Sequence, residues 1–538
     1  MLWYETSRRT TALFLTAALC CRLATAAAEP GPASEPLARS IHTATQLHDG
    51  TLLVAGGLGA GGEALREAAR YQPEGDSWAG AAPMATARYG HTATALRDGR
   101  ILVVGGYDPV RGFLSEAEVY DPLDDSWTAA APIVPRRFLH TATLLEDGTV
   151  LVTAGDTDGG PLNDAWRYDP ETGAWMAAGT LQEGRYFHCA TLLPDGRVLA
   201  TGGYANDSVA LSSAETFDPE AGIWTAAAPM AAPRHSHAAV LLADGRVLAA
   251  GGGAPDPLNT SECYDPEQGS WTPAGSLGAA RFAHEAALLP DGRVLVAGGW
   301  DGAGLPAAWE VFDSDSGSWS TGGELPSGRR YHTMTLLPDG TALSLCGAGA
   351  GGPTAEAVRI SVPPAAGAVR PIPVVTQVSD PVRIGEPVLL AGEGFRGDSE
   401  ASGGGTRQCA VNLPLLRIEP SDGTGGAWIF PGTPWDDGSY ESVPLSGIPE
   451  GSAELFVVVS ALWSEPYCVE ILPAVTGPPG DCGDDGAVSI GEVQGAVNMF
   501  LGTAEIGCGV DGDADGSVSI GEVQRVINAY LDVMRMVQ

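Results

Sequence analysis

The sequence predicts a mostly β protein built from three folded parts, and three observations lead to this fold class. The chain of 538 residues is too long for one ordinary hydrophobic core. Its 73 Gly and 40 Pro, with only 18% charged residues, favour many short strands and turns over long helices. One pattern of His, Asp-Gly, Gly-Gly, aromatic-Asp-Pro and Trp returns every 47 to 49 residues, which is the signature of a repeat architecture.

The chain is strongly acidic. Its formal charge of -37 comes from 66 Asp and Glu against 29 basic residues, all of which are arginine. Such a field repels phosphate backbones, so we expect no nucleic-acid partner, whereas divalent cations are natural ligands.

Residues 1–28 are interpreted as a secretory signal peptide. Arg8 and Arg9 precede the apolar run "TALFLTAALCC", and the small residues up to Ala28 predict cleavage before Glu29. A short membrane anchor is the alternative, but the apolar run is well below the roughly 20 residues that span a bilayer. We therefore expect a secreted, extracellular or cell-surface protein with no membrane span, in a compartment that permits disulfides.

The repeat occupies residues 37–362, and each copy predicts four short strands. A His starts an apolar run that turns at Asp-Gly, and we interpret this turn as type I′, which needs positive φ angles. Sheets of this kind bury each other's faces, so one copy is one blade of a propeller. The repeated histidines are His42, His91, His140, His188, His237, His284 and His332.

The order of these elements resembles the kelch repeat, and seven units in register imply a seven-bladed kelch β-propeller. The seventh unit departs from the pattern, because it has "VRIS" at Val358 to Ser361 instead of aromatic-Asp-Pro and no Trp after it. The segment before His42 is a candidate for the missing strand.

The two ends of the propeller differ in sequence. Asp-Gly and Asp-Pro turns lie at one end, whereas the connections at the other end vary in length and composition. Rigid scaffolds usually carry binding on variable loops, so we expect a carbohydrate or protein ligand there.

An arginine stands three residues before each repeated His, and two interpretations remain open. Each arginine could pair with an acid on a nearby strand, or the seven could circle the axial opening and attract carboxylate or sulfate groups. Strict repetition favours the structural role, and the histidines are interpreted in the same way. The arginines are Arg39, Arg88, Arg137, Arg185, Arg234, Arg281 and Arg329, and the candidate acids are Glu118, Glu215, Glu262 and Glu310.

Residues 373–472 lose the repeat and alternate in short segments broken by Gly, which predicts an immunoglobulin-like β-sandwich. Cys409 and Cys468 are its only cysteines, and both a disulfide and two buried thiols fit. A kelch propeller followed by such a sandwich resembles galactose oxidase and its relatives, the copper radical oxidases. That resemblance implies Tyr331 and His332 as copper ligands, together with a sandwich histidine that this chain lacks.

The C-terminal region carries two calcium-loop patterns, each followed by a helical pattern. "DGDADGSVSIGE" fits D-x-D-x-D-G-x5-E at every ligand position, and "DCGDDGAVSIGE" has Gly483 where a third acid belongs, which predicts a weaker site. The expected ligands of the stronger site are Asp511, Asp513, Asp515, Ser517, Ser519 and Glu522. Those of the weaker site are Asp481, Asp485, Ala487, Ser489 and Glu492.

Two loop-then-helix units over residues 480–533 resemble a dockerin domain, a small α-helical calcium-binding module. The resemblance implies folding on Ca²⁺ and docking to a cohesin-type receptor, and Cys482 with Cys508 could link the two halves. The alternative is a calcium-stabilised cap without a receptor. The whole sequence thus favours a non-catalytic binding or adhesion protein that docks to a cohesin-type partner or cell-surface assembly. The alternative is a carbohydrate-active enzyme, either a copper radical oxidase or a polysaccharide hydrolase or lyase.

Overall fold

All regular elements in the described part of the chain are β-strands, which confirms the mostly β class. The computed structural model describes residues 37–47, 49–206, 209–365, 372–395, 402–403, 415–421, 428–430, 439–442, 445, 448–459 and 462–473. The predicted signal peptide (1–28) and the predicted calcium module (480–533) lie outside these residues. No helix long and apolar enough to cross a membrane occurs in the described ranges.

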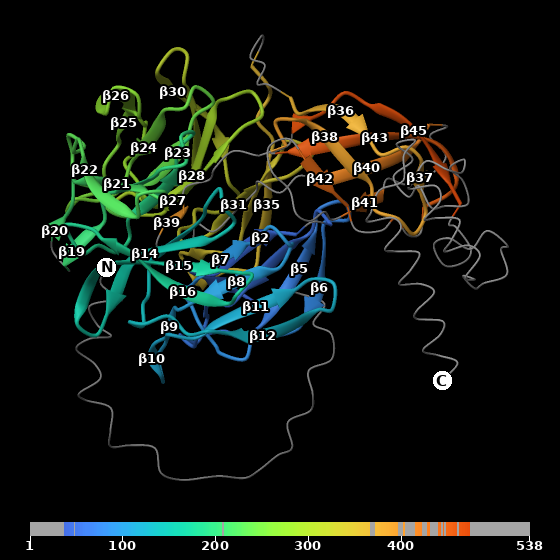
Figure 1. The fold of residues 1–538 in the computed structure, drawn as a ribbon. Helices are drawn as coiled ribbons and strands as arrows, with labels where there is room; N and C mark the ends of the chain where they lie inside the picture. Colours follow the sequence, from blue (N-terminus) through green and yellow to red (C-terminus); the bar gives the residue numbers. More distant parts are fainter. Residues whose placement is uncertain are drawn as a thin grey trace, which may run out of the picture. The chain divides into compact units, whose positions relative to one another are not determined.

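Each copy of the repeat forms one antiparallel sheet (Figure 1). The first sheet is β2 (Thr43–Gln46), β3 (Leu52–Ala55), β5 (Ala68–Gln72) and β6 (Ser77–Ala81). The second is β7 (Thr92–Ala95), β8 (Ile101–Val104), β11 (Ala117–Asp121) and β12 (Ser126–Ala130). The third is β13 (Thr141–Leu144), β14 (Val150–Thr157), β15 (Gly160–Asp169) and β16 (Ala174–Thr180).

The later copies continue the same order along the chain. The fourth sheet is β17 (Cys189–Leu192), β18 (Val198–Thr201), β21 (Ala214–Asp218) and β22 (Ile223–Ala227), with β39 (Ser402–Gly403) beside β17. The fifth is β23 (Ala238–Leu241), β24 (Val247–Ala250), β25 (Thr260–Asp265) and β26 (Ser270–Ser276). The sixth is β27 (Phe282–Leu288), β28 (Val294–Trp300), β29 (Ala308–Asp313) and β30 (Ser318–Glu324), and the seventh is β31 (Thr333–Leu336), β32 (Ala342–Leu345) and β35 (Ala357–Ile360).

Among the described residues, four short two-stranded sheets lie at the variable end. They are β1 (Arg39–Ser40) with β4 (Leu58–Gly59), β9 (Tyr107–Asp108) with β10 (Gly112–Phe113), β19 (Tyr204–Asn206) with β20 (Val209–Ala210), and β33 (Ala348–Gly349) with β34 (Gly352–Pro353).

The hydrophobic core lies between neighbouring sheets. One buried cluster joins Leu248 of the fifth sheet to Val294 of the sixth. Another joins Ala44 of the first sheet to Leu343 of the seventh, so the two ends of the repeat array share a core. Figure 1 accordingly shows β31 beside β2.

The seventh sheet has three strands among the described residues, and the described part of the segment before His42 does not complete it. Arg39 and Ser40 pair with β4 instead, and Arg39 also bridges to Thr354. The two ends meet through other contacts, because His42 Nε2 lies 3.2 Å from Thr333 Oγ1.

The Asp-Gly turns differ from the type I′ prediction. In the fourth repeat the N–H of Leu193 donates to the Arg197 carbonyl at 2.7 Å, which leaves a three-residue loop. Gly196 has a φ of 82°, whereas Asp195 is not among the residues with positive φ. This combination is typical of a type I turn that ends in a left-handed Gly, and Asp195 Oδ1 accepts the Arg197 N–H at 3.1 Å. The sequence marked the right position but the wrong turn, because Asp here supplies an acceptor rather than a positive φ.

The region predicted as a sandwich forms two sheets in its described residues. One contains β36 (Val374–Val378), β38 (Leu389–Glu393) and β42 (Ser439–Glu441). The other contains β37 (Val382–Arg383), β45 (Tyr467–Leu472), β43 (Gly451–Val459), β40 (Leu415–Pro420) and β41 (Trp428–Phe430), with β44 (Leu462–Trp463) beside β43. Cys468 carries a free, exposed thiol, so the structure does not support its bridge to Cys409, which lies outside the described residues.

Candidate functional site

The repeated arginines are buried structural residues, which confirms the structural interpretation. All seven are at most 1% exposed, and each donates from Nη1 to a backbone carbonyl at the end of the second strand of its own sheet. The four predicted acids are their partners, in the ion pairs Arg88–Glu118 (2.5 Å), Arg185–Glu215 (2.7 Å), Arg234–Glu262 (2.6 Å) and Arg281–Glu310 (2.6 Å). They are therefore unavailable to a ligand.

Three arginines depart from this scheme. Arg137 pairs with Asp164 at 3.1 Å and Arg329 with Glu356 at 2.5 Å, although neither acid stands in the predicted register. Arg39 donates to the carbonyls of Gly56 and Glu67 at 2.9 and 3.0 Å. Backbone carbonyls can replace the carboxylate because Arg offers five donors in one plane.

The repeated histidines bind neighbouring repeats together. His91 Nε2 lies 3.1 Å from Thr43 Oγ1 of the first repeat, and His140 and His188 make the same contact with Thr92 and Thr141 at 3.0 Å. Burial is the main cause that holds the pKa of these three histidines well below the ordinary range. They are neutral hydrogen-bonding partners near neutral pH.

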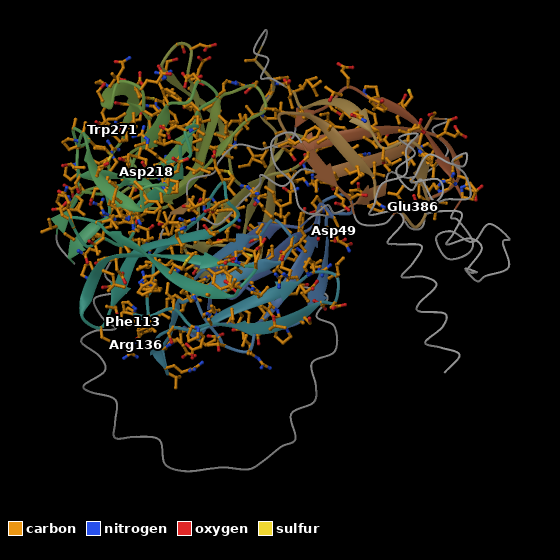
Figure 2. The ribbon with its side chains drawn as sticks, in the orientation of Figure 1. Asp49, Phe113, Arg136, Asp218, Trp271 and Glu386 are labelled. Carbon is orange, nitrogen blue, oxygen red and sulfur yellow. The ribbon has the colours of Figure 1, made fainter. Side chains whose placement is uncertain are left out.

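The repeated tryptophans fix the outer strands in the same way. Trp271 Nε1, labelled in Figure 2, donates to the Ala228 carbonyl of the preceding repeat at 2.8 Å. Trp127, Trp175 and Trp224 make equivalent bonds. The repeated residues thus explain the scaffold, and a functional site must use the residues that vary.

The residue before each repeated His forms a closed ring of backbone hydrogen bonds. Each N–H donates to the carbonyl of the matching residue in the preceding repeat, over 2.9 to 3.4 Å. Written as donor to acceptor, the bonds are Ile41 to Tyr331, Tyr331 to Ala283, Ala283 to Ser236, Ser236 to Phe187, Phe187 to Leu139, Leu139 to Gly90 and Gly90 to Ile41. We call these seven residues the axial ring, because a closed ring of equivalent positions encloses an axis.

Six of the seven axial-ring residues are not glycine, yet all seven have positive φ angles of 47° to 61°. A non-glycine residue in this conformation costs on the order of 1 kcal/mol, and a β-branched residue such as Ile41 is rarer still. The hydrogen bonds of the axial ring, together with the buried His and Arg that stand within two residues of each of its members in sequence, offset this strain. The position therefore constrains the backbone while leaving the side chain free to differ between repeats.

Aromatic side chains gather around the axial ring at the variable end. Six are half-buried, and we call them the aromatic face: Tyr89, Tyr107, Phe113, Phe187, Trp300 and Tyr331. Phe113, labelled in Figure 2, lies 5.3 Å from Tyr107 between ring centroids, and Phe187 lies 6.5 Å from Tyr331 in a stacked arrangement. Buried rings pack against them: Phe138 against Phe113, Tyr186 against Phe187 and Phe282 against Trp300.

His235 is a histidine outside the repeat pattern that the sequence interpretation overlooked. It is 4% exposed, its Nε2 lies 2.7 Å from Tyr204 Oη, and its Nδ1 lies 3.2 Å from Ser236 Oγ in the axial ring. Burial lowers its pKa to about 3, so it is neutral. The available signal was its offset, since it stands two residues before a repeated His where other repeats have Tyr, Phe, Ser or Arg.

Arg330 is the second overlooked residue. It is half-buried, its Cζ lies 5.4 Å from the Tyr331 ring centroid, and its side chain has no carboxylate partner among the described residues. Other arginines at the variable end are paired, for example Arg136 with Asp158 at 3.0 Å. A guanidinium over an aromatic ring keeps its donors available for an anion.

The residues predicted to bind calcium all lie outside the described residues, so their arrangement remains a sequence prediction. The predicted bridge between Cys482 and Cys508 also lies outside them.

Comparisons with known proteins agree with the repeat. A family model described as the KLHDC2/KLHL20/DRC7 Kelch-repeats domain matches residues 140–347, and one described as the Attractin/LZTR1 beta-propeller matches residues 25–217. No curated protein matches the chain. A solved structure of a fungal alcohol oxidase of the AA5 family, in complex with copper, matches with a TM-score of 0.53 and 18% identity, over 82% of this chain and 98% of its own. Such low identity shows the fold alone, and together these matches support a kelch-repeat propeller.

The residues of this chain do not fit a copper centre of the kind that the oxidase resemblance implies. His332 is fully buried, and a Cβ on Gly298 would meet its Cε1 at 2.6 Å, which is the packing that His91 makes against Gly56. The described residues contain no group of three or more His, Cys, Asp or Glu that could hold a metal. Residues 373–472 contain no histidine, so the predicted sandwich does not provide the second imidazole ligand that the resemblance implies.

Proposed function

We propose that this chain is an exported binding protein whose propeller binds a carbohydrate or protein ligand at the aromatic face. The observation that carries this proposal is the contrast within each repeat. The repeated Arg, His and Trp and the paired acids make hydrogen bonds and ion pairs inside the scaffold, whereas partly exposed aromatic rings from four repeats gather at the variable end. Amphipathic aromatic rings on a rigid frame supply contact area at low entropic cost.

The proposed architecture is a seven-bladed kelch propeller, an immunoglobulin-like sandwich and a C-terminal dockerin-like module. The seven-membered axial ring and the shared core of the first and seventh sheets support the blade count. The calcium-loop patterns support Ca²⁺ binding at residues 480–533 and docking to a cohesin-type partner. The N-terminal apolar run supports export to the cell surface or the medium.

A glycan array probed with the full-length protein tests the binding function. We expect a restricted set of glycans to bind, and Phe113→Ala to weaken that binding several-fold because one aromatic contact is worth about 0.5–1.5 kcal/mol. Val110→Ala is the matched control, since Val110 lies in the turn of the same β9–β10 hairpin but is 94% exposed and makes no ring contact in the described part of the chain. Equal affinities of the wild-type protein and the Phe113 variant would contradict the aromatic face as the binding site.

A copper radical oxidase is the second candidate, and the likeness in fold to the fungal alcohol oxidase is the observation that favours it. The shortage of metal ligands around the buried His332, among the residues that the structure describes, weighs against this candidate. Metal analysis distinguishes the two, because stoichiometric copper and peroxide formation from sugar alcohols would support the oxidase.

A further inference from the structure

One part of the aromatic face combines three kinds of side chain around the axial ring. Phe187 and Tyr331 provide stacked rings, Ser236 and Ala283 provide small side chains between them in the ring order, and Arg330 lies over Tyr331. These residues come from four consecutive repeats. We call Phe187, Ser236, Arg330 and Tyr331 the axial subsite.

We propose that the axial subsite binds a saccharide unit that carries an anionic group, with Arg330 as the partner of that group. This inference rests on the proposed binding function and deepens it by naming the ligand class. The anionic group is either a carboxylate or a sulfate, since a planar guanidinium can bind both through paired N–H donors.

The electrostatic argument starts from the absence of an acid beside Arg330. In a chain of formal charge -37, arginines near the surface usually lie against carboxylates, as Arg111 does against Glu116 and Arg136 against Asp158. Arg330 has no such partner among the described residues, although it is half-buried. A partly desolvated guanidinium without a counterion gains more from an incoming anion than one that is already paired.

The hydroxyl of Ser236 favours a saccharide as the carrier of that anion. His235 is neutral, so one ring nitrogen donates and the other accepts, and the ring contacts both Tyr204 Oη and Ser236 Oγ. If the imidazole donates to Ser236 Oγ, the hydroxyl can still donate to a ligand; if the imidazole accepts from it, the hydroxyl can still accept from a ligand. A fixed hydroxyl beside aromatic rings suits a sugar, which offers hydroxyl groups and an apolar ring face.

Isothermal titration calorimetry with the full-length protein tests the proposal. The salt concentration is about 0.15 M, because this salt screens the long-range repulsion between the acidic chain and an acidic ligand. The probes are tetragalacturonate, its methyl ester and a sulfated galactan oligosaccharide. We expect an acidic form to bind at least about tenfold more tightly than the uncharged ester, because a charge-assisted hydrogen bond is lost with the ester. The carboxylate and sulfate arms show which anion is preferred.

Arg330→Gln should abolish the preference for the acidic form, while Tyr331→Ala should weaken both forms. Arg136→Gln is the matched control, because Arg136 lies at the same end but pairs with Asp158, and it should keep the preference. If neither the galacturonate acid nor the sulfated oligosaccharide bound the wild-type protein more tightly than the ester, the subsite would be refuted while glycan binding stayed intact, and this comparison needs no variant. Absence of binding to any glycan would refute both proposals. Binding of a poly-glutamate peptide as tightly as the best oligosaccharide would assign the subsite to acidic peptides instead.

Discussion

Removing the charge of Glu262 should destabilise the propeller far more than removing the charge of an exposed carboxylate. Glu262 Oε1 lies 2.6 Å from Arg234 Nη2, and its carboxylate also accepts the backbone N–H of Ala231 at 2.7 Å and of Ala232 at 3.3 Å. The Arg234 side chain is 0% exposed and that of Glu262 is 7% exposed. In Glu262→Gln the amide nitrogen must face one of these donors, and the buried guanidinium loses its counterion.

Breaking one partner of a buried ion pair costs about 3–5 kcal/mol. Unfolding entropy is roughly 2.1 cal/mol/K per residue, so about 320 residues of repeat give roughly 0.7 kcal/mol/K and a fall in Tm of about 4–7 °C. Asp158→Asn removes the charge of an exposed pair, whose side chains are 51% and 60% exposed, and should lower Tm by at most about 1.5 °C.

Tryptophan fluorescence during thermal unfolding measures both shifts, because most of the repeats carry a buried or half-buried Trp beside the repeated aromatic. A fall in Tm below about 1.5 °C in Glu262→Gln would refute the argument that these buried pairs hold the repeats.

Three further predictions follow from the same scaffold and from the tail. Burial depresses the pKa of His42, His91, His140 and His188. The free energy of unfolding should therefore be at its full value above about pH 6.5 and fall below that pH, because the unfolded chain takes up protons there, by about 1.4 kcal/mol per pH unit for each histidine. In unfolding titrations between about pH 7.5 and 5.5, His140→Asn should reduce this slope by one proton. Gly298→Ala should abolish or strongly reduce soluble folded protein, since its Cβ would meet the Arg329 carbonyl at 2.5 Å. Gly269 also has a positive φ (63°, against 71° at Gly298), but a Cβ there meets nothing within 4 Å, so Gly269→Ala carries the backbone strain alone and should lower Tm far less. Metal analysis should find one to two Ca²⁺ per chain, and Glu522→Gln should lower that number by about one. A chelator should remove the helical circular dichroism signal without shifting the thermal unfolding of the propeller, and unchanged helicity would contradict the dockerin-like interpretation.

The scaffold was largely predictable because each repeated residue does the same work in every copy. The partners of Arg88, Arg185, Arg234 and Arg281 followed from a constant two-residue offset between each Glu and the repeated aromatic, and the structure confirms them. The offset failed for Arg329, because Glu356 stands on a connection before the third strand rather than within it. A pattern argument works only where the repeat keeps its register.

The candidate site was less predictable, because its residues are those that break the repeat. Tyr331 stood out in the sequence as an unpatterned residue, but nothing in the sequence placed Phe187 opposite it, since the two are far apart along the chain. His235 and Arg330 share one position in two repeats, where most other copies have an aromatic ring. Both residues matter through their contacts with members of the axial ring, Ser236 and Tyr331, and that ring closes only when repeats far apart in the sequence come together.

The sequence by itself determined the strand class, the number and register of the repeats, and the internal partners of most repeated charges. These depend on short-range periodicity, which is visible in one chain. Only the tertiary structure decided which side chains remain available to a ligand, because availability depends on contacts between repeats. Seven similar arginines are buried by their own sheets, and Arg330, one residue beyond Arg329, lies without a carboxylate partner in the described residues, beside an aromatic ring at the axis.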